Sequence, residues 1–191
     1  MQLILASASP RRRELLGLFG LPFVIRAADI DETMNPALPP EKEVARVSRL
    51  KALAVPREAE DVVIAADTIV VCGGRVLGKP HSHEEAAQML RLLSGRDHQV
   101  MTGCTVRAPG GTETFTEITD LHFRQLTEAE IARYVASGEP MDKAGAYGIQ
   151  GGAALFCQGI RGDYYNVMGL PVCRLGQVLK RKAPQLMEDT Q

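Results

Sequence analysis

The sequence lacks an excess of charge of either sign. Its 22 lysines and arginines nearly balance 23 aspartates and glutamates, so the formal net charge is -1. A chain balanced in this way has no global field that would draw it to nucleic acid or to an anionic membrane. Any site for an anion must therefore be local.

Long apolar runs are absent as well. No run approaches the roughly 18 residues that would span a bilayer. The first residues, MQLILASAS, lack the basic region of a signal peptide and turn polar too soon for one. We therefore expect a cytoplasmic protein that does not enter a membrane.

Cysteine is scarce. The four cysteines lie far apart along the chain, form no C-x-x-C pair and mostly sit in apolar stretches. This pattern is typical of reduced thiols, and it gives little support to a disulfide or a metal site built on cysteine.

Several common catalytic motifs are missing. The sequence has no G-x-S-x-G, H-E-x-x-H or G-x-G-x-x-G, so serine hydrolases, zinc proteases and Rossmann dinucleotide enzymes have no support. Residues 73–80 match a P-loop up to the last position, where Pro80 replaces the required Ser or Thr. Proline offers neither a hydroxyl for magnesium nor an N–H for phosphate. We reject a P-loop there but keep Lys79 as a candidate phosphate contact.

The chain is long enough to bury one sizeable core. It has 191 residues, of which 45% are hydrophobic, and we expect a single domain over residues 1–191 with a frayed tail at 184–191. Alternating strand and helix patterns, followed by a hairpin signal at residues 109–111, predict an α/β fold with a mixed sheet. The patterns predict strands at residues 3–6, 22–26, 62–66, 69–71, 75–77, 99–106, 112–123 and 153–160. They predict helices after Pro10 and at residues 41–55, 82–93, 127–137 and 171–182.

Two polar clusters follow apolar strands directly. One contains Ser9, Arg11 and Arg12, and the other is Asp67-Thr68. If these strands run parallel, the clusters meet at the carboxyl edge of the sheet, and a helix beginning near Pro10 would aim free N–H groups at an anion there. The alternative is that the serine only caps this helix and the arginines form its solvated first turn.

Asp67 and Lys51 occupy unusual positions for charged residues. Asp67 ends a five-residue apolar strand, where a carboxylate is costly to bury unless it is paired or metal-bound. It could ligate a divalent cation, act as general base toward water, or cap the following turn. Glu32, in an acidic loop, could supply a second oxygen ligand or could simply be solvated. Lys51 follows Val44 and Val47 on the apolar stripe of its helix, which is an odd place for a charge that needs only solvent.

Seven motifs follow one another along residues 3–172. They are SASPRRRELL, DIDET, AADTIVV, GKP, LSGRDHQVMTG, SGEPMDKAGAYGIQGGA and GDYYNVMGLP. In their order and spacing they resemble the Maf family of nucleotide pyrophosphatases. The resemblance implies a mixed α/β fold with two lobes around a cleft, similar to inosine triphosphate pyrophosphatases, and a homodimer. It also implies an enzyme dependent on Mg²⁺ or Mn²⁺ that cleaves a nucleoside triphosphate into a monophosphate and pyrophosphate.

The same resemblance assigns roles to individual residues. Asp67 would be the catalytic proton acceptor and would share a metal ion with Glu32. The residues implied to bind phosphate are Ser9, Arg12, Lys51 and Lys79.

The segment GAYGIQG indicates which class of nucleotide is the substrate. It resembles the branch of the family that acts on dTTP and UTP rather than on methylated guanine nucleotides. In that branch base selection is associated with Arg11, Thr68 and Gln150. A glutamine amide offers one donor and one acceptor face, which match O4 and N3–H of a pyrimidine, and a site built on such bonds rejects mismatched bases. Modified pyrimidine nucleotides are a further substrate class for the same site.

A hypothesis from another class is a regulatory nucleic-acid-binding protein linked to cell division or septum formation. It rests on the three consecutive arginines at residues 11–13 and on the family's historical association with inhibited septum formation. The balanced net charge argues against it.

Overall fold

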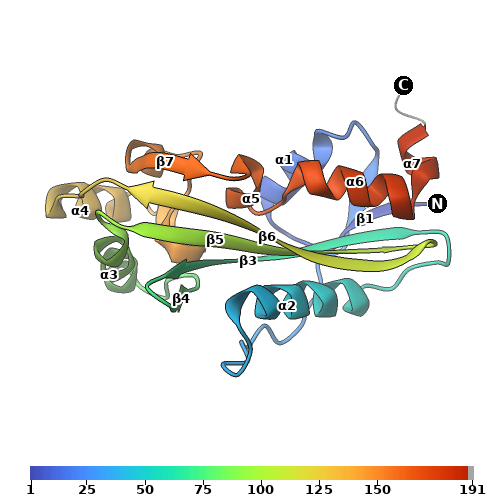
Figure 1. Cartoon of the computed structure of the whole chain (residues 1–191), viewed down its shortest axis with the longest axis horizontal. Helices are drawn as coiled ribbons and strands as arrows, with labels where there is room; N and C mark the ends of the chain where they lie inside the picture. The colour runs from blue at the N-terminus through green and yellow to red at the C-terminus, as the bar shows by residue number, and fades with distance from the viewer. Residues whose placement is uncertain (189–191) are drawn as a thin grey trace. The chain divides into compact units, whose positions relative to one another are not determined.

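The structure is a computed structural model that describes residues 1–188. Within this range seven strands form one mixed sheet in the order β2-β1-β3-β5-β6-β7, and β4 pairs with β3 off this path (Figure 1). The strands are β1 (Leu3–Leu5), β2 (Phe23–Ile25), β3 (Val62–Cys72), β4 (Arg75–Leu77), β5 (Asp97–Ala108), β6 (Gly111–Phe123) and β7 (Cys157–Arg161). The helices are α1 (Pro10–Gly17), α2 (Pro40–Ala54), α3 (His83–Leu93), α4 (Glu128–Ala136), α5 (Tyr164–Val167), α6 (Val172–Lys182) and α7 (Pro184–Glu188). Short 3-10 turns are η1 (Glu139–Asp142), η2 (Ala144–Ala146) and η3 (Gly152–Leu155).

The sheet combines parallel and antiparallel pairs. Strand β1 runs parallel to β2 and β3, with Leu5 opposite Ile25 and Ile64. Strand β4 is antiparallel to β3, and β7 is antiparallel to β6. The predicted mixed α/β fold is therefore confirmed. Because β1 and β3 are parallel, the polar residues that follow Leu5 and Ile64 lie toward the same end of this strand pair.

The chain divides into two compact units, and β3, β5 and β6 each run from one unit into the other along the chain. Unit 1 contains residues 1–67, 102–117 and the described residues from 169 onward, and unit 2 contains residues 68–101 and 118–168. The expectation of a single domain stays a prediction.

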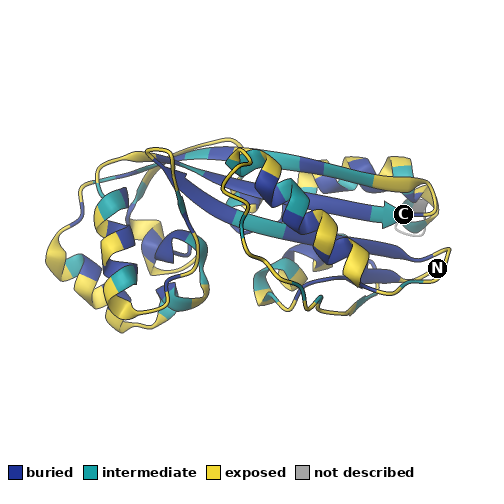
Figure 2. Cartoon of the chain, turned by 90° about the horizontal axis from the view of Figure 1, so that it is seen from below, coloured by how far each residue is buried: buried dark blue, intermediate teal, exposed yellow. Residues whose placement is uncertain are grey.

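Each unit has its own core. In unit 1, Ala52 and Val55 at the end of α2 pack with Ile4, Val63 and Ala65 of β1 and β3. Figure 1 shows α2 and α6 on opposite faces of the strands of this unit. In unit 2, His98, Tyr147 and Phe123 form edge-to-face aromatic contacts. Figure 2 shows the same pattern in both units, with the strands largely buried and the outer faces of the helices exposed.

Four details differ from the sequence predictions. Strand β3 continues through Asp67 as a single element instead of ending there, because the carboxylate is paired with a lysine. The predicted strand at 153–160 is shorter, since its first residues form the turn η3. Helix α5 was not predicted. Pro184 begins helix α7 where a frayed tail was expected, and Leu186 N–H donates to Ala183 O at 3.1 Å. Residues 189–191 of that tail lie outside the described residues.

Candidate active site

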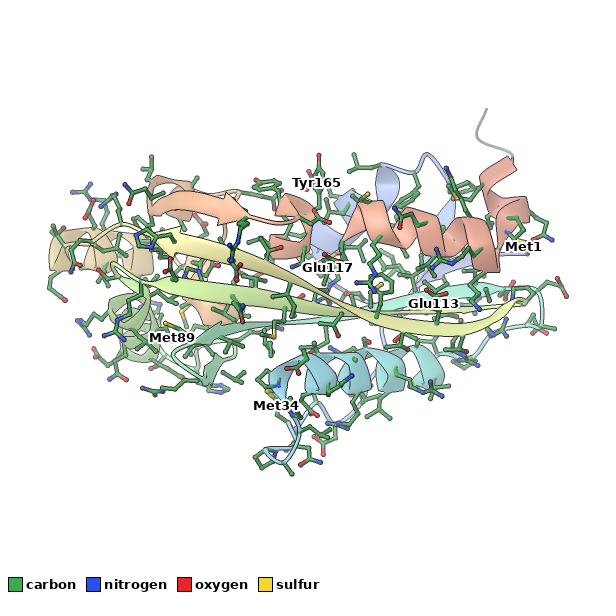
Figure 3. All side chains as sticks on the ribbon, in the orientation of Figure 1. Met1, Met34, Met89, Glu113, Glu117 and Tyr165 are labelled. Carbon is green, nitrogen blue, oxygen red and sulfur yellow. The ribbon has the colours of Figure 1, made fainter. Side chains whose placement is uncertain are left out.

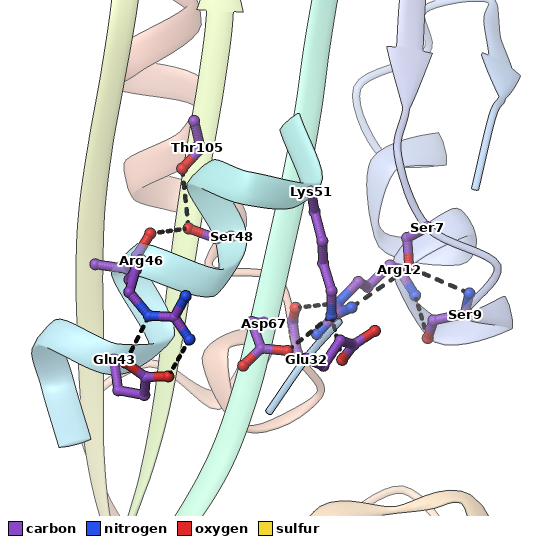
Figure 4. A network of polar contacts seen from close by, with 12 residues as sticks. Ser7, Ser9, Arg12, Glu32, Glu43, Arg46, Ser48, Lys51, Asp67 and Thr105 are labelled. Atoms are coloured by element: carbon purple, nitrogen blue, oxygen red, sulfur yellow. Dashed lines mark hydrogen bonds and ion pairs between the residues drawn. The ribbon is translucent and has the colours of Figure 1, made fainter. Parts of the chain in front are cut away.

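Two carboxylates converge on one ammonium group in unit 1. Lys51 Nζ donates to Asp67 Oδ1 at 2.8 Å and to Glu32 Oε2 at 2.7 Å (Figure 4). The Lys51 side chain is 10% exposed and that of Asp67 17%, whereas Glu32 is 54% exposed. The sequence places Lys51 on the apolar face of its helix, and the structure confirms this position, because Lys51 lies on the buried face of α2. Its charge is compensated there by the two acids.

Helix α2 holds Lys51 in place through a buried polar contact with the sheet. Ser48, which is fully buried one turn before Lys51, places its Oγ 2.9 Å from Thr105 Oγ1 of β5. Thr105 Oγ1 in turn lies 3.0 Å from Thr114 Oγ1 of β6. Ser48 and Thr105 are fully buried, so their hydroxyls satisfy each other away from water and fix the position of the helix along the strands.

Close backbone approach fixes the same helix at a second point. A Cβ at Gly103 of β5 would overlap with the Val44 carbonyl of α2 and would lie 2.6 Å from Ala45 N. Only glycine allows the helix to rest this close to the strand. At the far end of α2, Arg107 Nη1 donates to Ala52 O at 2.7 Å and so satisfies a terminal helix carbonyl.

The loop that carries Glu32 is tied to the start of α2. Glu43 is buried, and its carboxylate accepts from Arg46 Nε and from Asn35 N–H, both at 2.9 Å. Arg46 Nη2 also donates to Thr33 O at 3.0 Å. The hydrogen bond from Arg46 holds the pKa of Glu43 below its usual value. This pair therefore stays ionised and anchors the loop just after Glu32, at Thr33 and Asn35.

Ser9 and Arg12 form the turn after β1. Ser9 is the N-cap of α1 and accepts from Arg12 N–H at 3.5 Å. The Arg12 side chain folds back, so that Nε donates to Gly169 O at 2.8 Å and Nη1 donates to Ser7 Oγ at 3.4 Å. Arg12 is thus held by the protein, and the alternative of a solvated first-turn side chain is wrong for it.

Burial lowers the pKa of the Arg12 guanidinium, and the negative charge of Asp67 opposes this shift. In Figure 4 the guanidinium lies beside the Lys51–Asp67 pair. Arg12 of the first polar cluster and Asp67 of the second therefore lie close together within unit 1. The convergence of the two clusters as a whole stays a prediction.

Unit 2 carries three other predicted site residues. Thr68 follows Asp67 in β3 and is half-buried, whereas Lys79 and Gln150 are exposed. Gly145 N–H donates to Gly78 O at 3.0 Å, which joins the segment before Gln150 to the residue before Lys79. Their grouping with Asp67 stays a prediction, as does the specificity role of Arg11, which is half-buried in α1.

Residues 2–182 match the family described as Maf-like protein. This chain belongs to the Maf family. It is 52% identical over 181 residues to a dTTP/UTP pyrophosphatase of Geobacillus sp. (strain WCH70), covering 94% of this chain and 97% of that protein. It is 54% identical over 181 residues to a dTTP/UTP pyrophosphatase of Moorella thermoacetica (strain ATCC 39073 / JCM 9320), covering 93% of each.

A solved structure shares the fold of this Maf chain. The HAM1 protein from Coxiella burnetii superposes with a TM-score of 0.54 over 94% of this chain and 98% of that chain. The two sequences are 14% identical, so the likeness concerns the fold alone.

The two acids of this Maf chain, Glu32 and Asp67, are oxygen donors of the kind that a hard divalent cation prefers. Among residues 1–188 no group of three or more histidines, cysteines, aspartates and glutamates could hold a metal ion by itself. Glu32 and Asp67 nevertheless bring two carboxylates to a single point. Mg²⁺ commonly takes one or two carboxylates and fills its other positions with water and substrate phosphate. The residues present fit such a cation.

Some residues that shape the site were not predicted from the sequence. Gly169 and Gly103 lie inside the motifs GDYYNVMGLP and LSGRDHQVMTG, but only the structure shows that one fixes Arg12 and the other admits α2. Glu43 and Arg46 stand at i, i+3 spacing, which looks like an ordinary surface pair.

No helix within the described part of the chain is both long enough and apolar enough to cross a membrane. All four cysteines are free thiols, two of them buried, Cys72 and Cys104.

Proposed function

We propose that this Maf chain hydrolyses dTTP and UTP to the nucleoside monophosphate and pyrophosphate, with modified pyrimidine nucleotides as further substrates. The observation that carries the proposal is the meeting of Asp67 and Glu32 at Lys51, beside the guanidinium of Arg12. Such a site combines a proton acceptor with cations for a polyphosphate. The printed names of the relatives supply the choice of dTTP and UTP.

In the proposed reaction Asp67 accepts a proton from the attacking water. The water oxygen forms a bond to the α-phosphorus, the bond from that phosphorus to the bridging oxygen breaks, and pyrophosphate leaves with the electron pair. A bound Mg²⁺ or Mn²⁺, held by Glu32 and Asp67, would polarise the phosphate oxygens and offset their charge.

Lys51, Arg12 and the start of α1 are proposed to hold the triphosphate. Charge-assisted hydrogen bonds of this kind are worth about 1.5–3 kcal/mol each. Lys51 is oriented before substrate arrives, because its two acids and the packing of α2 limit its motion. Ser9, as the N-cap, stands where the free N–H groups of α1 attract anions. Lys79 is proposed to contact the same phosphates.

Base selection is assigned to Gln150, Thr68 and Arg11. The amide of Gln150 is exposed and can pair with O4 and N3–H of uracil or thymine. The proposal also includes a homodimer in the cytoplasm, and sedimentation of the purified protein would measure the oligomeric state.

The test is pyrophosphate release from each common nucleoside triphosphate, with Mg²⁺, with Mn²⁺ and after chelation. We expect selective cleavage of dTTP and UTP that needs the metal and falls by about 10²–10⁴-fold in Asp67→Asn. Glu60→Gln, an exposed acid of the same unit, serves as the control and should retain full activity. Cleavage of purine nucleotides would overturn the substrate assignment. Binding of DNA or RNA without any turnover would instead favour the regulatory hypothesis.

A further inference from the structure

The turn that presents Gln150 is fixed by two side chains from outside it. Gly148 N–H, two residues before Gln150, donates to Tyr134 Oη of α4 at 3.0 Å. Gly152 N–H, two residues after it, donates to Glu139 Oε2 of η1 at 3.0 Å. Both flanks of Gln150 are therefore bound through their backbone, and every residue involved belongs to unit 2.

Tyr134 and Glu139 are themselves joined. The Tyr134 hydroxyl donates to Glu139 Oε1 at 2.9 Å, so each carboxylate oxygen of Glu139 accepts one bond. Tyr134 is buried and makes an edge-to-face contact with Phe156 at 5.2 Å between ring centroids. Burial raises the pKa of the Tyr134 hydroxyl above its usual value, which keeps it a hydrogen-bond donor. We call these two residues the Tyr134–Glu139 clamp.

Two glycines of the turn, Gly151 and Gly152, leave room for the clamp. A Cβ at Gly151 would lie 2.6 Å from Glu139 Oε2, whereas a Cβ at Gly148 would first meet Lys143 Cε at 2.7 Å and lies 3.1 Å from Glu139 Oε1. A Cβ at Gly152 would lie 3.2 Å from the Tyr134 ring. A segment whose composition suggests flexibility is thus tightly packed against a carboxylate and an aromatic ring.

The one polar side chain that this turn exposes is Gln150, since Ile149 beside it is buried and the other three residues are glycines. We propose that Tyr134 and Glu139 are positioning residues that hold the Gln150 amide in the orientation needed to select a uracil or thymine base. This inference rests on the proposed function. The clamp belongs to unit 2 and the two acids to unit 1, so we assign the clamp to substrate choice and binding rather than to the proton transfer.

The test compares Tyr134→Phe and Glu139→Gln with a matched control. Tyr165, labelled in Figure 3, is an exposed tyrosine of the same unit, so Tyr165→Phe removes a hydroxyl outside the clamp. We expect each clamp variant to raise KM for UTP about tenfold and to lower the UTP-to-CTP ratio of kcat/KM about as much. Their kcat for UTP should stay within about twofold, and Tyr165→Phe should match the wild type.

A purely structural role for the clamp predicts a different result. It would lower Tm and leave the UTP-to-CTP ratio of the folded enzyme unchanged, which would overturn the inference. Combining Tyr134→Phe with Gln150→Ala supplies a second test, because a clamp that acts through Gln150 should add little once that amide is gone. Additive losses in the ratio would also refute it. Either clamp variant that folds is enough for the comparison.

The experiments distinguish a failure of the proposed function from a failure of the clamp inference. If the wild type cleaves neither dTTP nor UTP, the proposed function fails, and the role of the clamp in base selection fails with it. If the wild type is selective but both clamp variants keep that selectivity, only the clamp inference fails.

Discussion

Substitution of Gly103 by alanine tests how the site depends on the placement of α2. The added Cβ would overlap with the Val44 carbonyl and lie 2.6 Å from Ala45 N, whereas ordinary contacts begin at 3.4 Å. Both obstacles are backbone atoms of a helix, so no side chain can rotate away. The helix must retreat by about 1 Å, or the strand must bend.

The size of the effect follows from this geometry. Forcing extra volume into a packed interior costs about 1–3 kcal/mol. For a chain of this length each kcal/mol lowers Tm by roughly 2–4 °C, so we expect a decrease of roughly 2–12 °C. Lys51 lies on the same buried face of α2, two turns beyond Val44. A shift of about 1 Å at a positioning group can reduce turnover by about 10²-fold.

Thermal unfolding and steady-state pyrophosphate release would measure both effects. Gly159→Ala is the matched control, because Gly159 also lies in a strand but has no atom within 4 Å of the position of an added Cβ. This control should stay within about 0.5 kcal/mol of the wild type and keep its activity. A Gly103→Ala enzyme as stable and as active as the control would refute the idea that close approach of α2 positions Lys51.

Three further substitutions probe separate parts of the structure. Arg12→Lys keeps the charge but loses the fork that reaches Gly169 O, so KM for UTP should rise about tenfold, with exposed Arg13→Lys unchanged as control. Glu32→Gln should raise the Mg²⁺ concentration for half-maximal activity by about tenfold or more, and a metal titration would check it. Burial lowers the pKa of His98 to about 4 from 6.5, so the unfolded chain takes up this proton first as pH falls. The free energy of unfolding of the wild type should therefore drop by about 3 kcal/mol more than that of His98→Gln between pH 7 and 4, and urea titrations would measure it.

Local patterns predict much of the fold correctly. The apolar stripe through Val44 and Val47 predicts helix α2 to within a residue, and the spacing of Ser82 and Glu85 predicts the start of α3. The same stripe singles out Lys51 as a charge that needs compensation. These predictions succeed because a helix or strand depends mainly on residues a few positions apart.

Long-range contacts account for what was missed at the candidate site. The sequence interpretation ends an apolar strand at Asp67 and treats its carboxylate as costly to bury unless it is paired or metal-bound. In the structure Lys51 offsets that cost from a different element, and β3 continues. In the same way Arg12 is held by Gly169, which stands 157 positions away along the chain. A single sequence carries no signal for such pairs.

The turn around Gln150 shows that amino-acid composition alone also fails to predict how a segment packs. Three glycines within residues 148–152 favour a flexible loop when only the sequence is considered, because glycine adopts many backbone conformations. In the structure the absence of a Cβ matters more, since it lets the side chains of Glu139 and Tyr134 approach and hydrogen-bond the backbone of the turn. In the same way, the absence of a Cβ at Gly103 lets α2 pack directly against β5. In both units, therefore, a residue without a side chain fixes the position of the side chain proposed to meet the substrate, Lys51 in one case and Gln150 in the other.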